Sequence, residues 1–382
     1  MSTEPITHPP QTGSRSHSGQ SSRRLLSLDA LRGFDMFWIV GAEEVVHALY
    51  YAHPSAPLEL LKNQFTHKPW EGIGFYDLIF PVFVFIIGVS LVFSLSRTIE
   101  QFGAAIACRK VIFRGLVLYL IGIVYYGGLS KGVHDVRLLG VLQRLALCYL
   151  AAGLLFCALR TRGLVVACVT LLVGYWAMMS FIPVPGFGAG NFSEHANLAN
   201  YVDKEYLPFR KWDGDYDPEG LLSTLPAIAT CLFGVLAGLL LQNPKLADQR
   251  KVHWLLGAGV ASLVLGFAWG LQFPIIKKLW TSSYVLVAGG YSFLFLAAFY
   301  QVIEIWKFQK WAQPFVWIGM NPITLYLAWE LFPFPQLASR LAGGPIEARL
   351  GHLGPVFITM VSLGLVLLLS RFLYRRKIFL RL

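Results

Sequence analysis

Charged residues are scarce in this chain. Only 14% of its 382 residues are Asp, Glu, Lys or Arg, whereas 55% are hydrophobic. Soluble domains average about 25% charged residues, so the composition excludes an ordinary soluble enzyme. One membrane span needs about 20 apolar residues, so the length leaves room for many helices and for no large soluble domain.

Cysteine is also rare, and several well-known catalytic motifs are missing. The five cysteines lie within or beside apolar runs and form no CxxC pair, so we predict packing roles, no disulfide and no thiolate metal site. The chain contains no P-loop, GxGxxG, GxSxG or HExxH motif. We therefore expect no metal and none of the reactions that these motifs support.

Long, continuous apolar runs dominate what is present. Lipid offers no hydrogen bonds to the backbone, so runs of this kind predict helices rather than alternating strands. We expect an all-α, polytopic transmembrane bundle of about 10 spans within a single unit, residues 23–382. The expected spans are 28–50, 74–96, 111–128, 138–159, 164–182, 220–241, 253–272, 281–306, 314–334 and 353–373.

The distribution of charge predicts the orientation. Most Lys and Arg residues fall on one side of these spans, which predicts that both termini are cytoplasmic. Residues 1–22, rich in Ser, Pro and Gly, are expected to form a disordered cytoplasmic tail and not a secretory signal. The net charge of +11 is explained by the bilayer without a nucleic acid partner. A compact, basic chain of this kind favours a bacterial inner membrane.

The first expected span carries an unusual set of charges. On a continuous helix Asp29, Arg32, Glu43 and His47 would share one stripe, with Glu44 beside it. Ionised groups inside a membrane cost about 2.5–3.5 kcal/mol each, so such a stripe needs partners or a wet cavity. Asp29 and Arg32 could simply brace the helix end, or the set could bind a substrate.

His67 precedes the second span, at the predicted boundary between water and lipid, and faces the outside. Histidine titrates near neutral pH and suits acid–base chemistry, although a loop histidine can also be merely solvated. Pro69 and Trp70 could shelter its ring, and either Glu71 or Asp77 could orient it. Asp77 could instead be an ordinary carboxylate at a helix N-terminus.

Further polar residues interrupt later spans. Gln143 and Arg144 fall in the fourth span, where the arginine could pair a carboxylate of the first span or hold an anionic ligand. Asn321 and Glu330 fall in the ninth, where the Asn321-Pro322 step predicts a broken helix. The outside loop of 183–219 is polar and aromatic, so it could bind sugars or simply cover the bundle.

Four segments together resemble the heparan-alpha-glucosaminide N-acetyltransferase-like membrane proteins. They are RLLSLDALRG at 24–33, His67 with Trp70 and Gly72 before YDLIFPVFVFIIG, RLLGVLQRL at 137–145, and GMNPITLYLAWE at 319–330. The resemblance implies an enzyme that takes acetyl groups from cytoplasmic acetyl-CoA and delivers them to a terminal amino sugar across the membrane. It also implies that His67 takes part in the transfer.

The buried charges, His67 and the family resemblance together indicate one mechanism. Acetyl-CoA would be met by inside-facing basic residues, and His67 would act as general base or acetyl carrier toward an amino sugar or another glycan acceptor. The candidate cofactor-binding residues are Arg97, Arg109, Lys110 and Arg114. The alternative is a transporter or flippase that uses the buried charges as a relay. O-acetylation and a homodimer both stay open.

Overall fold

The computed structural model describes residues 25–130 and 132–379, and this part of the chain is helical. Its only pairings of strand type are two isolated bridges, Glu71 with Ile276 and Val184 with Gly188. The predicted disordered tail lies outside the described residues. The α-helices are α1 Leu26–Phe37, α2 Glu43–Ala52, α3 Ala56–Gln64, α4 Tyr76–Phe102, α5 Ala104–Tyr125, α6 Val141–Ala158, α7 Thr161–Phe181, α8 Leu198–Tyr206, α9 Thr224–Gln242, α10 Asp248–Gly270, α11 Ser282–Tyr300, α12 Gln313–Gly319, α13 Pro322–Leu331, α14 Phe334–Ala342, α15 Pro345–Leu350 and α16 Gly354–Arg375.

Seven helical segments of the described chain are long and apolar enough to cross a membrane by length and composition. They are Tyr76–Phe102, Val141–Ala158, Thr161–Phe181, Thr224–Gln242, Asp248–Gly270, Ser282–Ile305 and Pro345–Arg375. Each overlaps one of the expected spans. The other three expected spans coincide with the charged segment of α1 and α2, with α5 and its basic start, and with α12 and α13. The total of ten therefore stays a prediction.

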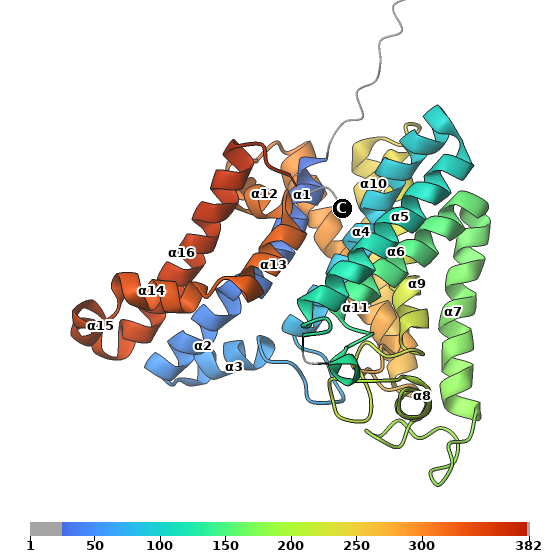
Figure 1. Ribbon diagram of the computed structural model, residues 1–382. Coiled ribbons are helices and arrows are strands. Elements are labelled where there is room, and N and C mark those ends of the chain that lie inside the picture. Colours follow the sequence, from blue (N-terminus) through green and yellow to red (C-terminus); the bar gives the residue numbers. More distant parts are fainter. Residues whose placement is uncertain (1–24, 131, 380–382) are drawn as a thin grey trace, which may run out of the picture.

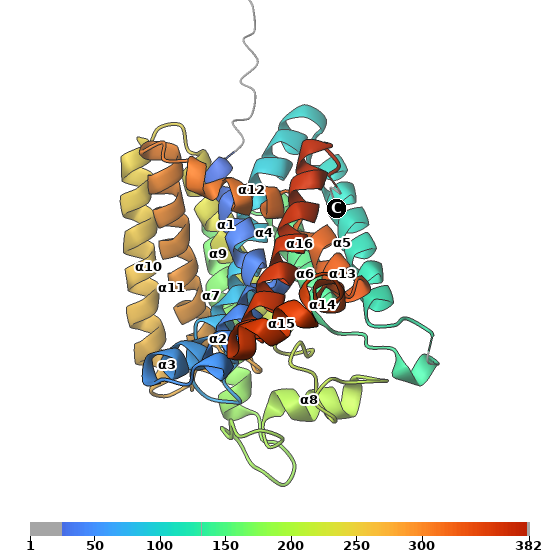
Figure 2. The ribbon, with the colours of Figure 1, turned by 90° about the vertical axis from the view of Figure 1, so that its left-hand side faces the viewer.

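The helices form two groups that meet along α1 (Figure 1). One group contains α4 to α7 and α9 to α11, in which α10 packs on α11 and α4 packs on α9. The other contains α2 and α12 to α16, and α1 contacts both α12 and α11. The start of α1 and the end of α16 lie at one end of the bundle, and α3 and α8 lie at the other (Figures 1 and 2).

Glycines allow two of these helix pairs to cross closely. A Cβ atom at Gly33 would lie 1.7 Å from the carbonyl oxygen of Phe315, and one at Gly319 would lie 1.9 Å from that of Asp29. Gly88 and Gly234 stand in the same relation between α4 and α9. In a bilayer no hydrophobic force drives helices together, so they associate through close packing, which small residues at the crossings allow. The bundle thus depends on backbone contact at both places.

Two interruptions shape the first and ninth expected spans. A π-helical turn, Trp38–Ala42, joins α1 to α2, and Gly41 there has a φ of +113°. The single stripe predicted for Asp29, Arg32, Glu43 and His47 is therefore wrong, because it assumed a continuous helix. The predicted break at Asn321-Pro322 is confirmed, since α12 ends at Gly319 and α13 begins at Pro322.

Candidate active site

The start of α4 holds a buried carboxylate. The side chain of Asp77 is fully buried, and its Oδ2 accepts hydrogen bonds from the backbone N–H groups of Gly74 at 3.0 Å and Lys68 at 3.3 Å. The hydroxyl of Tyr284, on α11, donates to the carbonyl oxygen of Asp77 at 2.6 Å. The loop and the neighbouring helix therefore fix this carboxylate in place.

His67 lies directly against Asp77. Its Nδ1 atom is 2.8 Å from Oδ1 of Asp77, and its ring lies 4.7 Å from that of Tyr76, measured between centroids. The imidazole side chain is 53% exposed, so a solute can reach it from the end of the bundle where α3 and α8 lie. Of the two carboxylates weighed from the sequence, Asp77 is the one in contact with the ring. Glu71 lines a neighbouring cavity instead.

Lys277 completes the cluster and was not singled out from the sequence. Its Nζ atom lies 2.8 Å from Nδ1 and 3.3 Å from Nε2 of His67, and 3.3 Å from Oδ1 of Asp77. The backbone N–H of Gly72 donates to the carbonyl of Ile275 at 2.9 Å, which draws the two loops together. In the sequence, Lys277 and Lys278 are visible only as a basic pair between two expected spans. The fold brings Lys277 to His67.

The cluster sets the charge state of His67. Burial lowers the pKa of His67, and the Lys277 ammonium lowers it further, while the contact with Asp77 opposes both. Burial also lowers the pKa of Lys277, against the attraction of Asp77. A proton on Nδ1 directed at Asp77 leaves the lone pair on Nε2 for chemistry. The imidazole is thus held neutral, oriented and accessible, as a general base or nucleophile requires.

The other candidate residues of the first span are spread along the bundle. Glu43 interacts with Tyr76 and, electrostatically, with Lys277, so it belongs to the neighbourhood of His67. Glu44 follows it on α2 and is half-buried. Asp29 and Arg32 lie nearer the opposite end and form an ion pair at 3.4 Å. Arg32 also donates to the Gly319 carbonyl and to Ser90, so it ties α1 to α12 and α4.

Both candidates of the fourth expected span lie on α6, and Arg144 faces the loop that precedes α9. Arg144 is fully buried, donates to Ser223 and to the Gly220 carbonyl, and lies 4.9 Å from the Trp280 ring. Within the described chain these are its hydrogen-bond partners, so the pairing with a first-span carboxylate that the sequence allowed does not form. Its Nε and Nη1 atoms have no hydrogen-bond partner there. Gln143 donates to the Arg137 carbonyl.

Arg137, which is not among the residues predicted from the sequence, binds two carboxylates. It donates to Asp217 at 2.8 and 2.7 Å and to Glu219 at 2.7 Å. Its guanidinium lies 4.5 Å from the Tyr126 ring and 4.8 Å from the Trp212 ring. This arrangement holds the end of the 183–219 segment against the residues that precede α6.

The ninth span contributes two separate positions. Asn321 donates to the carbonyl of Ile378 at 2.9 Å, near the end of the described chain. Glu330 is exposed near the end of α13 and interacts with Tyr125, whose ring stacks on Tyr326 at 4.9 Å. The two are therefore not part of one constellation with His67.

The candidate cofactor-binding residues gather at the end of the bundle away from His67. Arg97 lies near the end of α4, and Arg109 and Lys110 lie in the first two turns of α5. Arg114 lies at the middle of α5, with its guanidinium 5.9 Å from the centre of the Tyr149 ring. The other three are exposed, and Lys110 donates to Thr98 at 3.3 Å. The exposed members of this group thus form a small basic surface at the connection between α4 and α5.

Comparison with known proteins places the chain in a family. Residues 24–265 match the family model described as heparan-alpha-glucosaminide N-acetyltransferase, catalytic. The human protein of that name is 27% identical over 423 residues, covering 93% of this chain and 59% of the relative, and the mouse protein is 27% identical over 429 residues, covering 94% and 60%. The chain thus spans about three-fifths of the length of these relatives. It belongs to the heparan-alpha-glucosaminide N-acetyltransferase catalytic family.

Proposed function

We propose that this chain is a multi-pass membrane acetyltransferase. It moves an acetyl group from cytoplasmic acetyl-CoA to the amine of a glycan acceptor at the opposite face of the membrane, with His67 at the centre of the reaction. The observation that carries this proposal is the exposed His67 imidazole, 2.8 Å from a fully buried Asp77, in a chain of this family. A hydroxyl acceptor would use the same groups.

In the direct route, His67 acts as general base. The acceptor amine attacks the thioester carbonyl while Nε2 takes its proton, and the tetrahedral intermediate then expels the CoA sulfur, which receives that proton from the imidazolium. Asp77 stabilises the imidazolium because it lies at hydrogen-bond distance from Nδ1. Lys277, 3.3 Å from Nε2, is close enough to stabilise the oxyanion of the intermediate.

In the two-step route, His67 is the acetyl carrier. Nε2 attacks the thioester carbonyl, the bond to sulfur breaks, and CoA leaves with an acetyl-imidazole on the enzyme. The acceptor amine then attacks this acetyl group and forms the amide as the bond to Nε2 breaks, and the released Nε2 takes the amine proton, which it later gives to water. The exposed side of the ring supports this route, because the acceptor can approach after CoA has left.

The donor would bind at the basic surface formed by Arg97, Arg109, Lys110 and Arg114. Guanidinium and ammonium groups suit the phosphates of CoA. Residues 77 and 97 both lie on α4, so about 20 residues at 1.5 Å each separate the two ends by about 30 Å. This separation matches the hydrocarbon thickness of a bilayer and supports donor and acceptor sites on opposite faces.

The test is acetyl transfer by the purified chain in detergent. The protein is given acetyl-CoA with glucosamine or a glucosamine-ended oligosaccharide, and CoA release is measured beside His67→Ala. Acceptor-dependent release that is lost in the variant supports the proposal. Wild-type rates in His67→Ala would sink it. Uptake of the sugar into vesicles without CoA release would favour the transporter instead.

A further inference from the structure

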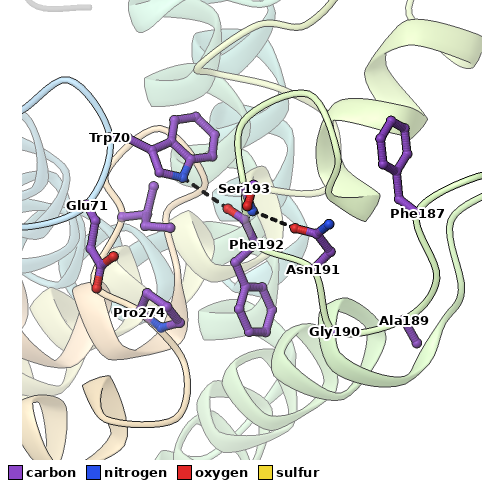
Figure 3. Close-up of a pocket in the computed structure, with 10 residues that line it drawn as sticks. Trp70, Glu71, Phe187, Ala189, Gly190, Asn191, Phe192, Ser193 and Pro274 are labelled. Carbon is purple, nitrogen blue, oxygen red and sulfur yellow. Dashed lines mark hydrogen bonds between the residues drawn. The ribbon is translucent and has the colours of Figure 1, made fainter.

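A cavity of about 570 Å³ opens between Trp70 and the loop that contains Phe187 and Asn191 (Figure 3). Its walls come from three chain segments that are far apart in the sequence. Trp70 and Glu71 lie on one side with Pro274, and the outside loop brings Phe187 and Asn191 from the other. Small-molecule sites typically measure about 300–1,000 Å³, so the cavity has room for a ligand.

The lining combines aromatic rings with a few polar groups. The indole N–H of Trp70 donates to the Phe192 carbonyl at 3.0 Å, which holds that ring in place. Asn191 accepts from the backbone N–H of Ser193 at 2.9 Å, so its amide group is also fixed. Phe187 stands at the rim, 55% exposed. Sugar rings present apolar faces for such aromatics and hydroxyls for such amides.

The charge of the lining restricts the ligand further. Among the described residues that form the cavity wall, Glu71 alone is charged. A carboxylate attracts an amine and repels a sulfate or carboxylate group on the ligand. The wall therefore suits a neutral or amine-bearing sugar and disfavours a sulfated one.

The cavity adjoins the candidate active site through two of these three segments. Ile276 lines the cavity, and the next residue, Lys277, contacts His67. On the other segment, Glu71 pairs with Ile276 and lies four residues after His67. A glycan whose terminal ring is at His67 would thus have its next ring near this wall.

We propose that the cavity is a second sugar subsite. It binds the ring next to the acceptor sugar and selects oligosaccharides in which that ring is unsulfated. This inference rests on the proposed function for the identity of the neighbouring acceptor. It adds a preference for glycans of at least two rings in which the second ring carries no sulfate.

The first experiment compares acceptors that all carry a free terminal amine. They are methyl glucosaminide, the glucosamine disaccharide, and the same disaccharide sulfated on its second ring. For the wild-type chain we expect kcat/KM about ten-fold higher for the disaccharide than for the single ring, and sulfation should remove most of that gain. Equal values for the single ring and the disaccharide would overturn the subsite.

Variants locate the preference in the cavity. In Phe187→Ala, kcat/KM for the disaccharide should fall to within about three-fold of kcat/KM for the single ring, because the aromatic face that stacks on the second ring is lost. Glu71→Gln should weaken the discrimination against sulfate. Tyr206→Ala is the matched control, since Tyr206 is an exposed aromatic of the same loop outside the cavity. An equal loss for both acceptors in Phe187→Ala would contradict the proposal.

A binding measurement separates this inference from the proposed activity. Titration calorimetry with the disaccharide is run on His67→Ala, with and without Phe187→Ala. Binding that weakens by about ten-fold with Phe187→Ala, together with no acceptor-dependent CoA release by the wild-type chain, would keep the subsite and reject the acetyltransferase. Acetyl transfer with no dependence on the second ring or on Phe187 would reject the subsite and keep the enzyme.

Discussion

Asp77, at the start of α4, and Lys277, in the loop between α10 and α11, approach the same atom of His67. The Lys277 ammonium lies 2.8 Å from Nδ1, and the Asp77 carboxylate lies 2.8 Å from it as well. When the ring proton is on Nδ1 it bonds to Asp77, and the lysine then donates to the same carboxylate at 3.3 Å. The two residues thus act on the ring with opposite electrostatic effects.

Replacing Asp77 and Glu71 in turn should show which of the two carboxylates orients His67. Asp77→Asn keeps the size of the side chain but removes its charge, so the imidazolium loses its partner and kcat should fall by about 10²–10⁴. Glu71→Gln should cost far less with a one-ring acceptor, because Glu71 lines the cavity and Asp77 contacts the ring. The measurement is CoA release at saturating acetyl-CoA. A larger loss in Glu71→Gln would assign the orienting role to Glu71.

The pH profile tests the opposing effects on His67. Burial and Lys277 lower the pKa of His67, so the neutral, active imidazole should persist below pH 6.5 and the acid limb of kcat/KM should lie there. Lys277→Gln removes a positive neighbour and should move that limb to higher pH. Asp77→Asn removes the opposing negative charge and should move it to lower pH. Shifts in the same direction for both variants would contradict this assignment.

The basic surface at the other end of α4 should govern donor affinity. Arg109→Ala combined with Lys110→Ala removes two exposed charges, and the KM for acetyl-CoA should rise by about ten-fold with a smaller change in kcat. The rise should diminish in high salt, because exposed charges are screened. Lys245→Ala, an exposed basic residue in another loop, is the control. An unchanged KM in the double variant would exclude this surface as the donor site.

Local features were predictable from the sequence, whereas contacts between distant segments were not. Apolar runs and the Asn321-Pro322 step gave helices and a break that the structure contains, because both depend on neighbouring residues. The kink at Gly41 was missed, since its φ of +113° accompanies packing against Trp329 and does not follow from periodicity. Lys277 was missed because 210 residues separate it from His67.

Arg137 should be critical for folding of the outside loop. Arg137→Ala leaves Asp217 and Glu219 without their guanidinium, and unpairing buried charges costs about 3–5 kcal/mol. The midpoint of thermal unfolding in detergent should fall clearly. Arg137→Lys should recover only part of it, because a lysine cannot form the two-pronged contact with Asp217. Arg210→Ala, an exposed arginine of the same loop, should leave the midpoint unchanged.

The crossing of α1 and α12 should tolerate no side chain at Gly33. A Cβ there would lie 1.7 Å from the Phe315 carbonyl oxygen, so Gly33→Ala must push the two backbones apart, at a cost of about 1–3 kcal/mol or more. Gly364→Ala is the matched control on α16, where nothing lies within 4 Å of the new Cβ and alanine favours the helix by about 1 kcal/mol. The midpoint of thermal unfolding should therefore fall in Gly33→Ala and stay the same or rise in Gly364→Ala. Arg32 donates to the Gly319 carbonyl at this same crossing, so Gly33→Ala should also break that bond, and an unchanged unfolding midpoint in Gly33→Ala would refute close packing here.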